Sequence, residues 1–244
     1  MTTLCLDFGN TRFKAAVYQH AEMIEEVTLP NQNIDTFQYL LETYQPKNII
    51  LASVIDISPE LLTFFQTQSH FFQVSDTLNL NFNISISKSS TIGADRLALA
   101  AAAVEMFPKK NNLIISIGTC ITYNFINQYH QFLGGGISPG VNMRFQALHQ
   151  NTAHLPLVNE DFSIPFIGYD TKTSMQSGVI FGMIAEVEGM IDRYQQKYDS
   201  FNVVLTGGYA PYFARQLKYR IFADPNFLFK GLYILSERNK HPND

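Results

Sequence analysis

The chain has 244 residues, of which 46% are hydrophobic and 16% charged, and its formal net charge is -4. This length allows one large domain or two small ones, and the apolar fraction excludes a disordered chain. The mild acidity argues against nucleic acid as a partner, because phosphate binding needs a basic excess on at least one face. The sequence shows no membrane span, no signal peptide and no disulfide framework. We therefore expect a cytoplasmic protein that binds neither nucleic acid nor a membrane.

The first half is expected to open with three strands and to continue as alternating helices and strands. Leu4 begins a buried run that ends in a polar turn containing Gly9. An alanine-rich helix is expected after Gly93. The other predicted elements are strands over 13–18, 22–28, 48–54 and 71–74, and helices over 35–44 and 59–68.

The second half repeats this opening. The run Leu113-Ile-Ile-Ser-Ile-Gly-Thr again joins a buried strand to a turn, so that Gly118 stands where Gly9 stands in the first half. Strands interleaved with helices favour an α/β sheet in each half, with one domain over 1–110, a second over 111–244 and a frayed tail from Glu237. The other predicted elements are strands over 121–126, 131–138 and 203–206, and helices from 141, over 173–198 and over 209–217.

The segment Asp7-Phe-Gly-Asn-Thr-Arg-Phe-Lys14 is the first candidate site. A strand that ends in an acid and a Gly-Asn-Thr turn brings backbone N–H groups, a hydroxyl and an amide to one point, which suits phosphate oxygens. Asp7 would hold Mg²⁺ directly or through water, and Lys14 would lie near the phosphates. An ordinary hairpin turn, in which Asp7 accepts turn hydrogen bonds, explains this segment equally well.

Repetition favours the phosphate interpretation. Ser116-Ile-Gly-Thr119 occupies the matching place in the second half, and Thr206-Gly-Gly208 follows another strand. Two facing Gly-Thr turns would hold the phosphates of a nucleotide in a cleft between the domains. The double glycine would let an adenosine approach the backbone closely.

The run Gly93-Ala-Asp-Arg96 is the second candidate site. Asp95, in the first turn of a helix, either complements the helix dipole or acts as general base toward a substrate hydroxyl, with Arg96 holding a substrate carboxylate. On these four residues alone, the structural role is the simpler explanation. A weak base still suffices for phosphoryl transfer, because the hydroxyl needs orientation more than early deprotonation.

Other features of the sequence are less informative. The glycine run Gly134–Gly140 fits neither the Walker A nor the Rossmann pattern, and a loop that packs tightly and caps a helix explains it as well. The histidines are scattered, which argues against a zinc site, and no Gly-x-Ser-x-Gly elbow supports a serine hydrolase. Cys120 is expected to be a small buried residue rather than a reactive thiol.

Together and in this order, these segments resemble the type III pantothenate kinases, a family of the acetate and sugar kinase/Hsp70/actin superfamily. The resemblance spans nearly the whole chain. The segments that carry it are Asp7–Lys14, Gly93–Arg96, Gly118-Thr119 with Thr122, Gly135–Gly140 with Thr152–Pro156, Asp170–Gly178 and Thr206–Gly208.

The resemblance implies two ribonuclease H-like domains and an enzyme that transfers the γ-phosphoryl of ATP to the hydroxymethyl oxygen of pantothenate, the first step of coenzyme A synthesis. Asp95 would be the catalytic base. The family is homodimeric, builds its pantothenate pocket partly at the dimer interface, and uses Mg²⁺ and a monovalent cation, K⁺ or NH₄⁺. ATP would be bound by Asp7, Phe8, Gly9, Asn10, Thr11, Arg12, Phe13, Lys14, Gly118 and Thr119, and the substrate by Gly93, Ala94, Asp95, Arg96 and Thr171.

The sequence departs from the family pattern at three places. Ser116, where the family has the aspartate that binds the monovalent cation, supplies an oxygen but no charge, so we expect weak dependence on K⁺. Asn124 replaces a second aspartate. Ile86 and Ser89 stand where the family has a Tyr-x-x-Pro stretch, so the tyrosine contact to the substrate is lost or supplied by another residue.

The lost acids leave two alternatives open. In the first alternative, the chain is a non-catalytic relative that serves as a regulatory or binding module. In the second, it is a related enzyme of the superfamily that acts on another small hydroxy acid. The intact Asp7 and Asp95 favour the pantothenate kinase, because a binding module has no chemical use for them.

Overall fold

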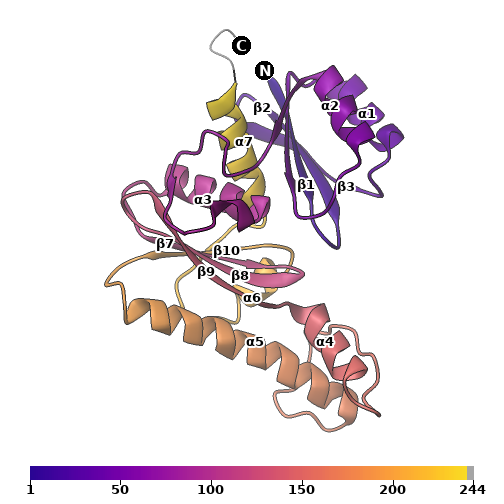
Figure 1. Ribbon diagram of the computed structural model, residues 1–244. Coiled ribbons are helices and arrows are strands. Elements are labelled where there is room, and N and C mark those ends of the chain that lie inside the picture. The colour runs from indigo at the N-terminus through magenta and orange to yellow at the C-terminus, as the bar shows by residue number, and fades with distance from the viewer. Residues whose placement is uncertain (241–244) are drawn as a thin grey trace. The chain divides into compact units, whose positions relative to one another are not determined.

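The computed structural model describes residues 1–240, which form two compact units, each built around a β-sheet (Figure 1). Unit 1 contains Met1–Lys109, Ile126–Leu133 and the segment that begins at Asn226. Unit 2 contains Lys110–Phe125 and Gly134–Pro225. These units are defined by which residues pack together. The domains over 1–110 and 111–244 were inferred from the repeated sequence motif, and they stay a prediction.

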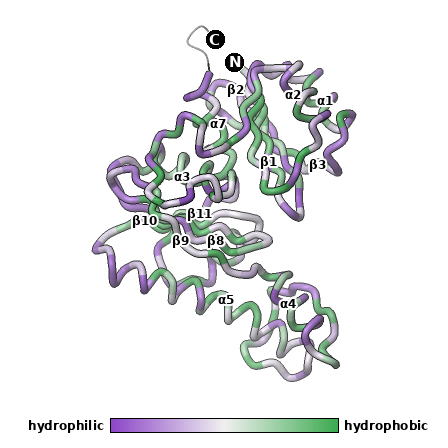
Figure 2. Tube along the Cα trace, in the orientation of Figure 1, coloured by the Kyte–Doolittle hydropathy of each residue, from purple (hydrophilic) through white to green (hydrophobic). Residues whose placement is uncertain are grey.

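Unit 1 is built on a five-stranded sheet with the order β3-β2-β1-β4-β5. The first three strands form the predicted antiparallel meander, and β4 pairs in parallel with β1 and with β5. Hydrophobic residues run along β1, which is the central strand (Figure 2). The bounds are β1 Thr2–Phe8, β2 Phe13–Gln19, β3 Glu22–Leu29, β4 Asn48–Ser53 and β5 His70–Gln73.

Helices cover both faces of this sheet, which explains why β1 is apolar on both sides. On one face, α1 (Ile34–Tyr44) and α2 (Pro59–Gln68) contribute Phe37 and Phe65 to a core shared with β1 and β4. On the other, α3 (Ala94–Met106) and α7 (Phe227–Asn239) pack on each other and on β4 (Figure 1). Gly231 lets the two helices approach closely, since a Cβ there would lie 1.9 Å from the carbonyl oxygen of Ala98. The short turn Ser89–Thr91 precedes α3.

The structure corrects the predicted frayed tail. Helix α7 continues through Glu237 to Asn239. It is ordered because Leu232 and Leu235 are fully buried in unit 1 and Asn239 Nδ2 donates a hydrogen bond to the carbonyl oxygen of Asn79. The part of the tail over 241–244 lies outside the described residues.

The second sheet has the strand order β11-β10-β7-β8-β9-β6. As predicted, the three consecutive strands β7, β8 and β9 are neighbours in this sheet, and β10 pairs in parallel with β7. The bounds are β7 Asn112–Ile117, β8 Cys120–Ile126, β9 Gln131–Pro139, β10 Asn202–Thr206, β11 Phe222–Ala223 and β6 Asn83–Ile84, which pairs with the part of β9 that belongs to unit 1.

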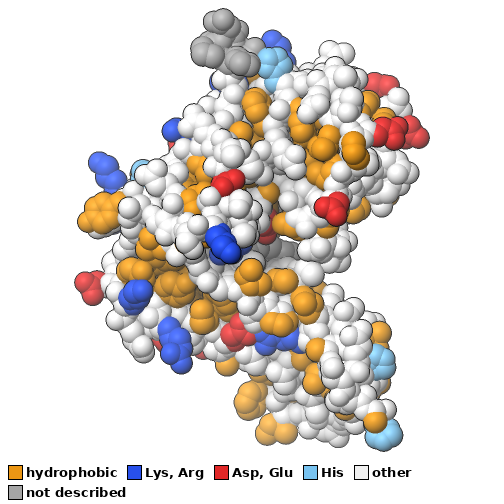
Figure 3. All heavy atoms as spheres, in the orientation of Figure 1, with side chains coloured by type: hydrophobic (Ala, Val, Ile, Leu, Met, Phe, Trp, Pro, Cys, Tyr) orange, Lys and Arg blue, Asp and Glu red, His pale blue; other side chains and the backbone are white. Residues whose placement is uncertain are grey.

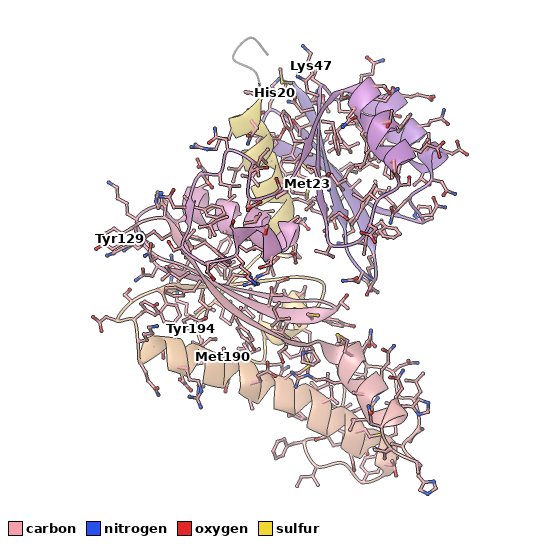
Figure 4. The ribbon with its side chains drawn as sticks, in the orientation of Figure 1. His20, Met23, Lys47, Tyr129, Met190 and Tyr194 are labelled. Carbon is pink, nitrogen blue, oxygen red and sulfur yellow. The ribbon has the colours of Figure 1, made fainter. Side chains whose placement is uncertain are left out.

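Three helices complete unit 2: α4 (Val141–Gln150), the long α5 (Thr171–Gln195) and the short α6 (Ala210–Phe213). Helix α5 turns Met183 and Val187 into the core, and Met190 and Tyr194 pack beside them on its sheet side (Figure 4). Helix α6 is shorter than the predicted 209–217, because the amides of Arg215 and Gln216 bond to carbonyls three residues back and the chain continues as turns. No helix within residues 1–240 is long and apolar enough to span a membrane.

Candidate active site

The first predicted turn lies at the end of β1 in unit 1. Asp7 pairs with Lys14 across the β1–β2 hairpin and with Ala52 on β4, so it stands where two parallel strands end. The N–H of Gly9 closes the turn on the carbonyl oxygen of Arg12 at 3.1 Å. The bend therefore carries a carboxylate at its base, and its exposed tip consists of Asn10, Thr11 and Arg12.

Two of the predicted ATP-binding residues, Phe8 and Phe13, serve the packing of the hairpin. Their rings meet edge to face with centroids 5.5 Å apart, and Phe8 is buried in the core of unit 1. Any contact of these two residues with a nucleotide would therefore come from their backbone.

Asp95 lies in the first turn of α3, and its carboxylate folds back over Gly93. A Cβ at Gly93 would lie 2.4 Å from Asp95 Oδ1, so only glycine leaves room for this arrangement. The carboxylate also accepts backbone hydrogen bonds from the first turn, including one from Arg96. The structural role considered for Asp95, stabilisation of the helix start, is therefore present and holds the carboxylate in a fixed place.

Asp7 and Asp95 are close enough in unit 1 to interact electrostatically. Burial and the charge of Asp95 raise the pKa of Asp7 to about 7, while the charge of Lys14 opposes this. Burial also raises the pKa of Asp95, against the hydrogen bond and the charge of Arg96. Two neighbouring carboxylates with raised pKa values are typical of a site that binds a cation or transfers a proton.

The two cationic side chains of this site are each held by a neighbour. Lys14 Nζ lies 2.6 Å from Glu26 Oε1 on the adjacent strand β3. The guanidinium of Arg96 lies over the ring of Phe132, 5.6 Å from its centroid. Both contacts restrict where the positive charges can point.

The sequence motifs do not identify Glu26 or Phe132. Glu26 faces Ala16 in the β2–β3 pairing, which makes it the diagonal neighbour of Lys14, so the register of the meander would have revealed it. Phe132 comes from the segment Ile126–Leu133, and no local pattern indicates that this segment packs with unit 1.

The second predicted turn follows β7 in unit 2. The N–H of Gly118 donates to the carbonyl oxygen of Cys120 at 2.9 Å, which closes the bend. A Cβ at Gly118 would meet no atom within 4 Å. The packing of the protein therefore does not require glycine at this position, and the free space suits close approach of a ligand to the backbone.

Two other glycines fix the place of this bend. Gly140, which precedes α4, donates its N–H to the carbonyl oxygen of Thr119 at 3.0 Å, and a Cβ there would lie 2.3 Å from the carbonyl oxygen of Gly118. Gly207, after β10, has a φ of 92°, and its Cβ would lie 2.5 Å from the carbonyl oxygen of Ile117. The bend is thus enclosed by two chain segments at contact distance. The close contact at Gly140 agrees with the interpretation of Gly134–Gly140 as a tightly packed segment before a helix.

Two of the positions that depart from the family pattern, Ser116 and Asn124, lie in unit 2. Ser116 is the neighbour of Thr206 in the β7–β10 pairing, and Thr206 Oγ1 is buried without a hydrogen-bond partner among the described residues. Both residues offer neutral oxygens. Asn124 is fully buried, and its Nδ2 donates to Thr122 Oγ1 at 3.1 Å. The amide at 124 therefore has a structural role that a buried charge would not fit.

An open pocket of about 990 Å³ lies between α4 and α5 in unit 2. Thr171, the predicted substrate contact of the second half, lies on its wall together with Arg144. The rest of the lining is largely apolar and includes Leu148, Leu155, Met175 and Val179.

The residues at Asp7 fit a divalent cation. Within residues 1–240, no three His, Cys, Asp or Glu side chains gather as a complete metal site. Mg²⁺ needs no such cage, because it takes one or two carboxylates and completes its shell with water and substrate phosphates. A divalent cation would also relieve the repulsion that raises the pKa of Asp7.

Several solved structures, among them sugar kinases, share the fold of this chain. A glucokinase from an Antarctic psychrotroph aligns with 97% of this chain and 99% of its own, with a TM-score of 0.52 and 10% identity. A ROK family protein from Streptococcus pneumoniae aligns with 98% of each chain, with a TM-score of 0.52 and 14% identity. A conserved Baf family protein from Campylobacter jejuni aligns with 99% of this chain and 100% of its own, with a TM-score of 0.63 and 20% identity. At these identities the likeness concerns the fold alone, and it confirms the predicted α/β class with two ribonuclease H-like domains.

Sequence comparison narrows this class to one family. The family profile of type III pantothenate kinase matches residues 3–193. A type III pantothenate kinase of Flavobacterium johnsoniae is 39% identical over 233 residues, which cover 94% of this chain and 95% of that protein. One of Bacteroides fragilis is 38% identical over 235 residues, with coverages of 94% and 95%. The chain belongs to the type III pantothenate kinase family, as its motifs predicted.

Proposed function

We propose that this chain uses ATP to phosphorylate pantothenate to 4'-phosphopantothenate, the first step of coenzyme A biosynthesis. Membership of the family makes it a kinase, which uses ATP and a divalent metal ion. The observation that carries the proposal is the pair of half-buried carboxylates with raised pKa values, Asp7 and Asp95, at the motif positions expected to hold the metal and to act as base. Such a pair destabilises a fold, so a pure binding module would have no reason to keep it.

In this proposal, Asp95 orients the hydroxymethyl oxygen of pantothenate and accepts its proton as the phosphoryl group arrives. The raised pKa of Asp95 suits this role, because it makes the carboxylate a stronger base than an exposed one. Arg96 pairs with the pantothenate carboxylate through its planar fork, and Phe132 restricts its orientation. The backbone at Gly93 and Ala94 and the hydroxyl of Thr171 complete the substrate contacts.

ATP is bound by the two bends. Asp7–Lys14 supplies the exposed tip and the ammonium of Lys14, which shares its charge between Glu26 and a phosphate. Gly118 and Thr119 supply backbone groups to ATP, and the space beside Gly118 is open for it. Mg²⁺, when bound, would be held at Asp7 and would neutralise the charge that develops on the transferred phosphoryl group.

We place this kinase in the cytoplasm as a homodimer, and the surface of unit 2 supports the dimer. Large hydrophobic side chains are exposed in the loop between α4 and α5 and just before α5 (Figure 3). A second copy of the chain would remove this apolar surface from water and would enclose the pocket that contains Thr171. The exposed residues are Leu157, Phe166, Ile167 and Tyr169.

One assay tests the function. Purified protein is incubated with ATP, Mg²⁺ and pantothenate, and ADP release is followed for the wild type and Asp95→Asn. We expect turnover by the wild type and its loss in Asp95→Asn. Asp35→Asn is the matched control, because Asp35 occupies the first turn of α1 and is exposed. Absence of turnover by folded wild type would contradict the proposal, and turnover on other hydroxy acids alone would indicate a related kinase.

The dependence on K⁺ forms a separate prediction. Ser116 provides a neutral oxygen where the family has a charge, and its strand neighbour Thr206 adds only another neutral oxygen, so we expect kcat/KM to change little when K⁺ is replaced by choline at constant ionic strength. The Ser116→Asp variant is expected to increase the dependence. A strict requirement for K⁺ in the wild type would show that other groups build that site.

A further inference from the structure

Unit 2 contains a polar cluster that the proposed chemistry does not use. Tyr123 on β8 donates its hydroxyl proton to Glu186 Oε1 on α5 at 3.0 Å. Arg144 on α4 forms an ion pair with the other carboxylate oxygen, Glu186 Oε2. The side chains of Arg144 and Glu186 are 22% and 26% exposed, and Tyr123 is buried. At this degree of burial the pair is screened less by water than an exposed salt bridge is.

Arg144 directs further hydrogen bonds to the end of strand β9, directly before α4. Its Nε donates to the carbonyl oxygen of Pro139 at 2.9 Å, and its Nη2 donates to Ser138 Oγ at 3.0 Å. A single planar guanidinium thus ties residues 138–139 to the middle of α5. A lysine has one nitrogen and could not make these three contacts together.

The end of β9 held by Arg144 leads directly into the residue that packs against the Gly118–Thr119 bend. Gly140 follows Pro139 directly, bonds to the carbonyl oxygen of Thr119 at 3.0 Å and has no room for a Cβ against Gly118. Movement of residues 138–140 would therefore displace the bend. Tyr123 lies on the strand that leaves the same bend, so the cluster holds both of its sides.

We propose that Arg144, held by Glu186 and Tyr123, is a positioning residue that sets the place of the Gly118–Thr119 bend for nucleotide binding. This inference rests on the proposed function, in which the bend binds ATP. Arg144 also lies on the wall of the pocket that contains Thr171, so direct contact with pantothenate is the competing role. Burial and the charge of Glu186 raise the pKa of Tyr123, so its hydroxyl remains a donor at neutral and alkaline pH.

Kinetics separate the two roles. For Arg144→Ala we expect KM for ATP to rise about tenfold and KM for pantothenate to stay within about twofold, because displacement of a binding group by less than 1 Å has effects of this size. Glu186→Gln is expected to behave in the same direction, and Arg144→Lys to restore only part of the loss. Arg193→Ala, at an exposed arginine of α5, is the control and should match the wild type. A rise in KM for pantothenate with unchanged KM for ATP would overturn the proposal.

Hydrogen exchange provides a readout that does not depend on catalysis. The amides of Gly118 and Gly140 report on the bend. The hydrogen bond from Gly118 closes the bend, and the one from Gly140 holds Thr119 to the start of α4. We expect faster exchange over 116–120 and 138–141 in Arg144→Ala and Glu186→Gln, with β10 unchanged and the circular dichroism of a folded protein. Unchanged exchange at the bend would overturn the proposal even if activity fell.

The two experiments also distinguish failure of this inference from failure of the proposed function. If the wild type neither binds ADP in calorimetry nor turns over, the proposed function is wrong, and the exchange result alone decides whether Arg144 holds the bend. If the wild type is active and the variants show faster exchange with unchanged KM for ATP, the positioning role is wrong.

Discussion

Asp7 shows at the scale of a residue how a half-buried carboxylate beside another acid opposes stability. Its pKa is raised from 3.8 to about 7 by burial and by the charge of Asp95, so the folded protein holds this proton more tightly than the unfolded chain does. Its contribution to the free energy of unfolding is therefore fully present below about pH 4 and is lost as the pH rises through about 7. Above about pH 7, the ionised carboxylate of Asp7 therefore lowers the free energy of unfolding.

Asp7→Asn is expected to stabilise the protein and to abolish turnover. At pH 8 the gain in the free energy of unfolding should reach up to about 4 kcal/mol, since about 3 pKa units correspond to about 1.4 kcal/mol each. The gain should shrink toward pH 4, because the wild-type carboxyl is then protonated in the fold. Urea unfolding at several pH values measures this, with Asp35→Asn as the exposed control. Equal stability of wild type and Asp7→Asn at pH 8 would refute the raised pKa.

Gly93→Ala tests whether the place of the Asp95 carboxylate matters for activity. The φ of Gly93 is -58°, which alanine adopts without strain, but its Cβ would displace Asp95 Oδ1. We expect a folded protein with a thermal midpoint near that of the wild type and a kcat lower by at least about tenfold. Gly182→Ala on α5 is the control, because a Cβ there meets nothing within 4 Å. An unchanged kcat in Gly93→Ala would show that Asp95 acts from another position.

At the scale of an element, the bend after β7 joins two glycines with opposite requirements. Gly118 faces free space, whereas Gly140 faces backbone carbonyls that cannot move away cheaply. Packing therefore explains glycine at 140 but not at 118, where we propose that close approach of a ligand requires it. Substitution at these two positions, which lie close together in space, should therefore affect ligand binding at one and stability at the other.

Gly118→Ala should leave the thermal midpoint nearly unchanged and weaken ADP binding, because the added methyl group projects only into the free space. Gly140→Ala should lower the midpoint by several degrees, since a strained core contact costs about 1–3 kcal/mol. Scanning calorimetry and titration calorimetry with ADP check both variants. The reverse order of stabilities would contradict this assignment of the two glycines.

How much of the molecule the sequence predicts depends on where each element obtains its stability. Helix α2 was predicted with its observed bounds, Pro59–Gln68, because Ser58 caps it and proline begins it, and both signals are local. Helix α7 was not predicted, because its place depends on contacts with α3 and β1, which lie far away in the sequence. The same reason applies to the site: Asp7 and Asp95 come from motifs, whereas Phe132 reaches Arg96 only through tertiary packing.

At the scale of the whole molecule, unit 1 is assembled from three separate stretches of the chain. The last of them supplies α7, whose Phe227, Phe229 and Leu232 are buried in this unit. Tyr233 on the same helix stacks on Tyr18 of β2 with ring centroids 4.7 Å apart. Without this helix, the surface that it covers on β1 and β4 would be exposed to water, because α3 packs mainly on β4 on this face.

A chain that ends at Pro225 should therefore lose unit 1. We expect aggregation on expression, or loss of the cooperative unfolding transition, because the removed helix covers β1 and β4. As a control, a peptide of residues 226–244 is added to the truncated protein, and recovery of the unfolding transition would show that the loss is reversible. A soluble truncated chain with the unfolding transition of the full protein would show that α7 is dispensable.

The long separation in sequence between β1 and α7 has a consequence for biosynthesis. The N-terminal part of a polypeptide leaves the ribosome first, so the strands of unit 1 emerge long before the helix that covers them. Unit 1 consequently reaches its final packing only once α7 has emerged, and until then nascent chains carry an uncovered apolar sheet that molecular chaperones would bind.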